Sequence, residues 1–89
     1  MKIEKIYELN QTLAIKRSII YNLCESTVEG KTVYGIEIIV NSNDKQESSK
    51  IENVSYDKNQ VVNIITLLYE NAVDISHFKD VVEDYISLL

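Results

Sequence analysis

The chain has 89 residues, of which 45% are hydrophobic and 26% charged, with two glycines and no proline. This is the composition of one folded globular domain covering residues 1–89, and it excludes a linker or a repeat array. Fourteen acidic against nine basic side chains give a net charge of −5, and this negative field repels phosphate backbones, so we expect no nucleic-acid partner.

The N-terminal segment interleaves charged and apolar residues in the run MKIEKIYELNQ. It therefore lacks the continuous apolar stretch of a signal peptide, and no later run is long enough to span a bilayer. The one cysteine, Cys24, cannot form an internal disulfide, which agrees with a reducing compartment. We expect a cytoplasmic protein with no membrane contact.

The clearest alternation runs over residues 12–26, where apolar and polar side chains follow one another. A period of two predicts a strand with one face in solvent. Arg17 breaks the pattern because it falls among the apolar positions. It indicates either a bulge near residues 16–18, which we favour, or a side chain that reaches the edge of the sheet.

Two shorter strands flank this long one. Residues 3–9 alternate as well and predict a short edge strand, joined to the long strand by a tight turn at residues 10–11. On the other side, residues 28–31 contain the glycine that a chain reversal needs, and residues 34–40 alternate again. We expect three consecutive antiparallel strands.

The segment 41–50 has no apolar residue, so it predicts a polar loop, either a solvated hairpin tip or a disordered segment. After it, Ile51, Val54 and Tyr56 indicate a weak fourth strand.

Helical spacing then replaces the alternation. Asp57 and Gln60 stand in a capping-box arrangement, and the apolar side chains that follow predict a helix over residues 58–71. Asp74 can cap a second helix that runs towards Leu89. The second helix has an apolar face (Ile75, Phe78, Val82, Tyr85 and Leu89) and a polar face (Asp80, Glu83, Asp84 and Ser87).

These elements predict an α+β fold. An antiparallel meander sheet of three to four strands (residues 1–56) is followed by two C-terminal helices (residues 57–89) packed on one of its faces. The alternative is a three-stranded sheet in which residues 51–56 are irregular.

Few residues could support catalysis. His77, Asp80 and Asp84 have a spacing that could bind a divalent metal weakly, but such sets are common on acidic helices. A nucleophilic set of Cys24, His77 and Asp80 has no local motif behind it, and an inert thiol is the better interpretation. Neither glycine precedes a helix in the way that phosphate-binding loops require. We expect no catalytic residue, no cofactor and no metal.

The most distinctive surface is the strip formed by His77, Asp80, Glu83 and Asp84, the densest charge cluster in the chain. We predict that a protein partner docks there, although such faces often serve only solubility. The function indicated is a small regulatory or adaptor module that binds a protein. The alternatives are a small-molecule sensor or, less well supported, a metal-dependent enzyme.

A second surface is the face of the sheet that the helices leave uncovered. A moderately polar face of this kind suits a symmetric mate, so we expect a homodimer through it. Its residues are Thr12, Ala14, Ser18, Ile20, Asn22 and Cys24, with Val33 and Ile39 if they take the same side.

The run YENAVDISHFKDVVEDYI at residues 69–86 follows a Tyr-Gly-Ile strand at residues 34–36. Together they resemble a small family of uncharacterised proteins from clostridia-like Gram-positive bacteria, classed as a domain of unknown function. The resemblance covers roughly residues 18–86, and where the family often has a proline this chain has Ile75. It implies a bacterial cytoplasmic protein with a sheet and two helices, and it implies no activity or cofactor. The residues that carry it are Asn71, Val73, His77, Asp80, Val81, Val82 and Asp84.

Overall fold

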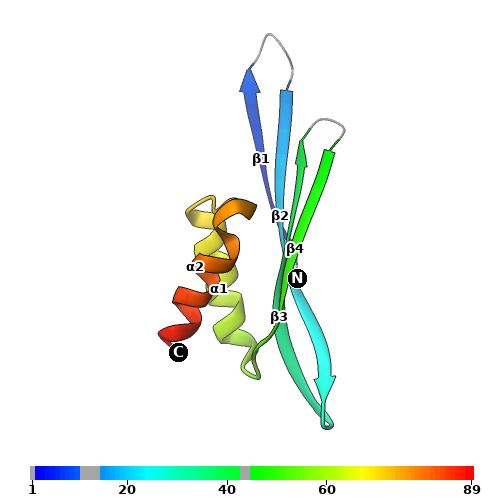
Figure 1. Cartoon of the computed structure of the whole chain (residues 1–89), viewed down its shortest axis with the longest axis vertical. Helices are drawn as coiled ribbons and strands as arrows, with labels where there is room; N and C mark the ends of the chain where they lie inside the picture. The colour runs from blue at the N-terminus through cyan, green and yellow to red at the C-terminus, as the bar shows by residue number, and fades with distance from the viewer. Residues whose placement is uncertain (1, 11–14, 43–44) are drawn as a thin grey trace.

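Strands come first and helices last along the chain. The structure, a computed structural model, describes residues 2–10, 15–42 and 45–89. Within these residues four strands form one antiparallel sheet in the order β1-β2-β3-β4, and both helices lie against one face of it (Figure 1). This confirms the predicted α+β fold. The elements are β1 (Lys2–Asn10), β2 (Ile15–Val28), β3 (Lys31–Ser42), β4 (Lys45–Ser55), α1 (Lys58–Glu70) and α2 (Ile75–Ser87).

The middle strands β2 and β3 are joined by a two-residue turn. Glu29 and Gly30 both have positive φ, 51° and 76°, as in a type I′ turn, whose twist matches that of the flanking strands. The pairing then continues without a shift along both strands. The reversal predicted at residues 28–31 is confirmed.

One core lies between the sheet and the helices. Alternate residues of β2 and β3 point towards the helices, and the apolar arcs of α1 and α2 pack against them. Each such side chain contributes about 1.5–3 kcal/mol when fully buried. The core side chains are Ile19, Tyr21, Ile36, Ile38 and Val40 from the sheet, and Val61, Ile64, Ile65, Leu68, Phe78 and Val82 from the helices.

The polar segment 41–50 belongs to the β3–β4 hairpin, in agreement with the hairpin alternative of the prediction, but most of it is strand and the prediction of a loop over its whole length is wrong. β3 runs to Ser42 and β4 begins at Lys45, so only residues 43–44 lie outside the described residues. This hairpin extends beyond the helices (Figure 1). Hydrogen bonds between the backbones of β3 and β4 form this hairpin. Its polar side chains are tolerated because the faces of these strands meet solvent. The strand predicted at residues 51–56 is the second half of β4, except that β4 ends at Ser55 and Tyr56 lies outside it.

The bulge predicted near residues 16–18 is also wrong. Arg17 pairs regularly with both neighbouring strands, and the register shift lies between Glu8 and Asn10 of β1. β1 is an edge strand, so an extra residue there breaks one ladder, whereas a bulge in β2 would break two. Of the turn predicted at residues 10–11, Asn10 belongs to β1 and Gln11 lies outside the described residues, as do Thr12 and Ala14.

Ser55 links the end of β4 to the start of α1. The Asp57 side chain caps the helix by accepting a hydrogen bond from the Asn59 backbone N–H at 2.9 Å. The second bond expected of a capping box, from Gln60, is relayed. The Asp57 N–H donates to Ser55 Oγ (3.0 Å), and that hydroxyl donates to Gln60 Oε1 (2.6 Å). α1 therefore begins at Lys58, as predicted.

A Schellman motif ends α1 and fixes where α2 starts. The Val73 N–H donates to the Leu68 carbonyl at 3.0 Å. The Ala72 N–H donates to the Tyr69 carbonyl at 3.2 Å, and Ala72 has the left-handed φ of 51° that this motif needs. Tyr21, which is fully buried in β2, donates its hydroxyl to the Val73 carbonyl at 2.7 Å. The connector is thereby tied to the middle of the sheet.

Candidate functional site

α2 follows this connector and carries the predicted docking residues. The Asp74 side chain caps it by accepting from the Ile75 N–H at 2.7 Å. Phe78 and Val82 are both 0% exposed and hold the inner face of the helix in the core. The N-terminal cap and the buried inner face hold the backbone of α2 in place. The side chains on its outer face therefore project from fixed backbone positions.

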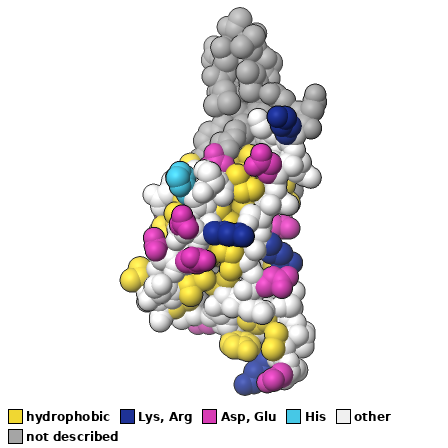
Figure 2. Space-filling model, viewed as in Figure 1, with side chains coloured by type: hydrophobic (Ala, Val, Ile, Leu, Met, Phe, Trp, Pro, Cys, Tyr) yellow, Lys and Arg dark blue, Asp and Glu magenta, His cyan; other side chains and the backbone are white. Residues whose placement is uncertain are grey.

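We define the acidic strip as His77, Asp80, Glu83 and Asp84 of α2. All four residues are exposed, and Figure 2 shows acidic side chains gathered near the single histidine over the helices. Within the described residues, none of the four side chains makes a hydrogen bond or ion pair. The structure therefore leaves them open to a partner.

The strip does not converge on a metal-binding arrangement. Among residues 2–10, 15–42 and 45–89, no group of three His, Cys, Asp or Glu side chains lies close enough to hold an ion. The set of His77, Asp80 and Asp84, which the spacing alone made a candidate, is accordingly not assembled. Side chains on an exposed helix face diverge into solvent unless a neighbouring element holds them together.

Charge is concentrated on the helical part of the chain. Residues 57–89 hold six acidic and two basic side chains, so they carry −4 of the net charge of −5. The side of the molecule that bears the acidic strip therefore has the stronger negative field.

Both helices are short. α1 and α2 have 13 residues each, and no helix in the described part of the chain is long and apolar enough to cross a membrane.

Cys24 lies on the other side of the sheet from α2. Tyr21 and Leu23 of the same strand pack towards the helices, so alternation directs Cys24 to the uncovered face, the sheet face without helices. His77 and Asp80 stand beyond the core on α2. The nucleophilic set of Cys24, His77 and Asp80 is therefore not assembled.

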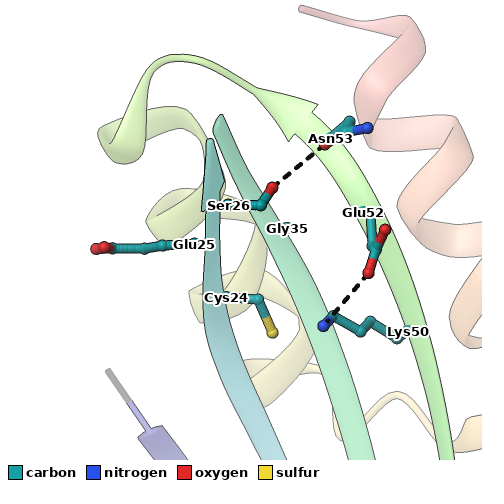
Figure 3. A pocket seen from close by; sticks show the side chains of 7 residues that line it. All are labelled: Cys24, Glu25, Ser26, Gly35, Lys50, Glu52 and Asn53. Carbon is teal, nitrogen blue, oxygen red and sulfur yellow. Dashed lines mark hydrogen bonds and ion pairs between the residues drawn. The ribbon is translucent and has the colours of Figure 1, made fainter. Parts of the chain in front are cut away.

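A small hollow on the uncovered face surrounds Cys24 (Figure 3). Gly35 is the cross-strand partner of Cys24, and a Cβ at residue 35 would lie 2.6 Å from the Ile51 carbonyl oxygen. Only glycine therefore lets β4 pass so close. The pairing of β3 with β4 shifts at this point, and Asn53 has a φ of 56°. The hollow is lined by Cys24, Glu25, Ser26, Gly35, Lys50, Glu52 and Asn53.

Polar contacts surround the thiol without activating it. Lys50 Nζ lies 3.5 Å from Glu52 Oε1, and the Ser26 hydroxyl donates to Asn53 Oδ1 at 3.4 Å. Burial raises the pKa of the Cys24 thiol, and the nearby Lys50 charge opposes this only in part. A thiol with a raised pKa stays protonated at neutral pH and is a poor nucleophile. The hollow is therefore a by-product of the irregular strand pairing.

The sequence-based prediction missed this hollow and the irregular pairing that forms it. Its one signal is Gly35, because glycine in the interior of a strand marks a bulge or a close backbone approach. Which residues of β4 pass over the glycine depends on the register of the β3–β4 hairpin. The polar segment 41–50 contains no apolar pattern that could reveal that register.

Comparison with known proteins adds a family but no activity. A model of a family of unknown function, DUF6514, matches residues 1–88. The chain belongs to this family. No curated protein and no solved structure matches the chain. The predicted resemblance to a domain of unknown function is confirmed over nearly the whole chain, whereas the bacterial, clostridia-like origin stays a prediction.

Proposed function

We propose that the chain is a small cytoplasmic regulatory or adaptor module that binds another protein through the acidic strip of α2. The observation that carries the proposal is the contrast across this one helix. The strip is exposed and makes no side-chain bond within the described residues, while Phe78 and Val82 on the inner face are 0% exposed. A rigid helix presents its side chains with less backbone ordering on binding than a loop does.

The partner that fits has a basic surface. Three carboxylates within two turns of α2, in a segment that carries −4 of the chain's −5 charge, attract positive groups and speed their encounter. Such an attraction weakens as salt rises, because exposed charges are screened beyond about 8 Å at physiological ionic strength. His77 adds a ring that can donate or accept a hydrogen bond at one end of the strip.

Binding accounts for the arrangement of reactive groups better than catalysis does. The one histidine and the one cysteine of the chain lie on opposite sides of the sheet, so they cannot act on one substrate atom. Burial also holds the pKa of the Cys24 thiol above its ordinary value. The strip, in contrast, needs no further group in order to bind.

The test compares variants that change the same amount of charge in two places. The wild-type chain, an Asp80→Lys/Asp84→Lys variant and a Glu25→Lys/Glu29→Lys control are immobilised and exposed to a lysate of the source organism. Glu25 and Glu29 are exposed near the β2–β3 turn. Partners are quantified by mass spectrometry, and the Kd of a purified partner is then measured by titration calorimetry.

We expect the wild-type chain and the Glu25→Lys/Glu29→Lys control to capture the same partner, and the strip variant to lose it at an unchanged melting temperature. A His77→Gln variant separates the role of the ring from that of the carboxylates. If the strip variant captures the partner as well as the control does, the strip is only a solvated surface and the proposal is wrong.

A further inference from the structure

We propose that two copies of the chain pair through the uncovered face of the sheet, around a twofold axis that runs along the middle strands β2 and β3. This interface lies on the opposite side of the molecule from the acidic strip. It therefore stands or falls independently of the proposed function.

The surface that pairs is a patch of three rows across β2, β3 and β4. In each row the members are cross-strand partners, so they share one face of the sheet. We call it the three-row patch. Its rows are Ser18, Asn41 and Gln46, then Ile20, Ile39 and Ser48, then Asn22, Glu37 and Lys50.

The patch has an apolar centre between two polar rows. Ile20 and Ile39 are paired in the middle row, and neither belongs to the core between the sheet and the helices. Ile20 is only 9% exposed, whereas Ile39 is half-buried, so the apolar surface that a mate removes from water lies mainly on Ile39. An apolar centre with a polar rim is the usual anatomy of a protein interface.

Hydrogen bonds between neighbouring strands hold the polar rows in place. Asn22 Nδ2 donates to Glu37 Oε1 at 3.2 Å. In the other polar row, Asn41 Nδ2 donates to Ser18 Oγ at 3.4 Å and Gln46 Nε2 donates to Asn41 Oδ1 at 3.0 Å. Side chains that are already fixed lose less entropy when a second surface covers them.

Charge selects this face for a second copy. The three-row patch contains one acid and one base, Glu37 and Lys50, so its net charge is zero, whereas residues 57–89 carry −4. Two copies that approached helix to helix would bring like charges together. Pairing through the sheets places both helical layers on the outside and keeps the two acidic strips apart.

A twofold axis along β2 and β3 makes the β2 and β3 members of the rows complementary. It sets β2 of one copy over β3 of the other, because in an isologous interface each residue meets the counterpart of its own neighbour. Ile20 then meets Ile39 of the second copy, and the Asn22 amide meets the Glu37 carboxylate of the second copy. Apolar groups contact apolar groups, and an amide donor contacts an acceptor.

The first experiment measures mass by light scattering and sedimentation over a range of concentrations. We expect a wild-type dimer. An Asn22→Glu variant sets a carboxylate against Glu37 of the second copy, and the twofold axis repeats this pair, so the dimer Kd should rise at least about tenfold. An Asn63→Glu variant is the control, because it makes the same change at an exposed position of α1 and should leave the Kd unchanged.

The second experiment rescues the broken interface. An Asn22→Glu chain is mixed with a Glu37→Lys chain, which restores an attractive pair across the twofold axis in the mixed dimer only. We expect a one-to-one heterodimer, identified by native mass spectrometry. Absence of this heterodimer, with both variants folded by circular dichroism, overturns the proposed axis.

Cross-linking of the native cysteine gives a result that does not depend on folded variants. Cys24 is next to the patch, and for strands about 4.8 Å and sheets about 10 Å apart the two Cys24 residues lie about 11 Å from each other. A bis-maleimide with a spacer of about 10 Å should therefore link wild-type chains into a covalent dimer. A wild-type chain that is monomeric at its highest soluble concentration, or a dimer that this reagent does not link, overturns the proposal.

Discussion

The two faces of the sheet come from the same strands, yet different forces order them. On the helix side, Ile36 and Ile38 of β3 are 0% exposed, and burial against α1 and α2 fixes their positions. On the uncovered side, the intervening Glu37 and Ile39 are only half-buried, and side-chain hydrogen bonds such as that between Asn22 and Glu37 join the strands. Apolar packing thus stabilises one face, and hydrogen-bonded rows order the other.

This difference predicts how each face tolerates substitution. A well-packed face loses transfer free energy and gains a cavity when a side chain is shortened. A face made of partly exposed rows loses little stability when a side chain is shortened, provided that the backbone pairing remains. Comparisons of neighbouring residues on one strand measure the contrast directly, because the backbone environment is then nearly the same.

The largest effect is expected for Ile38→Ala measured against Ile39→Ala. The two residues are adjacent on β3, with Ile38 0% exposed in the core and Ile39 half-buried on the uncovered face. Ile38→Ala should lower the free energy of unfolding by about 2–5 kcal/mol. Ile39→Ala should cost about 1 kcal/mol or less, because no cavity forms. Urea unfolding at low protein concentration tests both, and equal costs would show that the two faces are packed alike.

The next largest effect is expected for Gly35→Ala, which places a side chain where β4 passes close to β3. The new Cβ would lie 2.6 Å from the Ile51 carbonyl oxygen, and backbone cannot move aside as a flexible side chain can. We expect a loss of about 1–3 kcal/mol, together with faster maleimide labelling of Cys24 as β4 is displaced from the hollow.

Gly30→Ala is the comparison for this change. Nothing lies within 4 Å of a Cβ at residue 30, where φ is 76°, so this variant adds left-handed strain but no clash. It should leave the labelling rate of Cys24 unchanged. If Gly35→Ala leaves both stability and labelling as they were, the close approach does not constrain the fold.

A smaller effect is expected for Tyr21→Phe, which removes a hydrogen bond between the core side of β2 and the α1–α2 connector. The hydroxyl of Tyr21 donates to the Val73 carbonyl at 2.7 Å. Without it that carbonyl loses its donor, at a cost of about 1–2 kcal/mol. Amide exchange at residues 72–75 should rise more than exchange in β2, whereas a uniform rise would contradict a local role for the bond.

The helix-side face was predictable because burial leaves a pattern in the sequence. Alternation over residues 12–26 and 34–40 predicted strands with apolar side chains on one face, and Ile19, Tyr21 and Ile38 of that face are buried. Helical spacing and the caps at Asp57 and Asp74 placed both helix starts correctly. The outward direction of the acidic strip followed from the same periodicity, since Phe78 and Val82 had to face the core.

The uncovered face was not predictable to the same degree, because the forces that order it leave no apolar pattern. Residues 41–50 have no apolar side chain, yet β4 begins at Lys45 because its backbone pairs with β3. The close approach at Gly35 depends on the register of that hairpin. The left-handed Asn53 belongs to the same irregular pairing, and only the fold places it beside Ser26.

The smallest effect is expected from a comparison of two left-handed residues, one on each side of the sheet. Ala72 on the helix side has a φ of 51°, and Asn53 on the uncovered side has a φ of 56°. A Cβ makes this conformation unfavourable by about 1–2 kcal/mol for alanine, whereas asparagine tolerates it. Ala72→Gly should therefore raise the free energy of unfolding by about 0.5–1 kcal/mol, since glycine relieves the strain but loses more entropy on folding. Asn53→Gly should change it by less. Paired urea titrations measure the free energy of unfolding of both variants. If Asn53→Gly stabilises the fold more than Ala72→Gly does, the strained backbone lies in the strand pairing on the uncovered face and not in the connector.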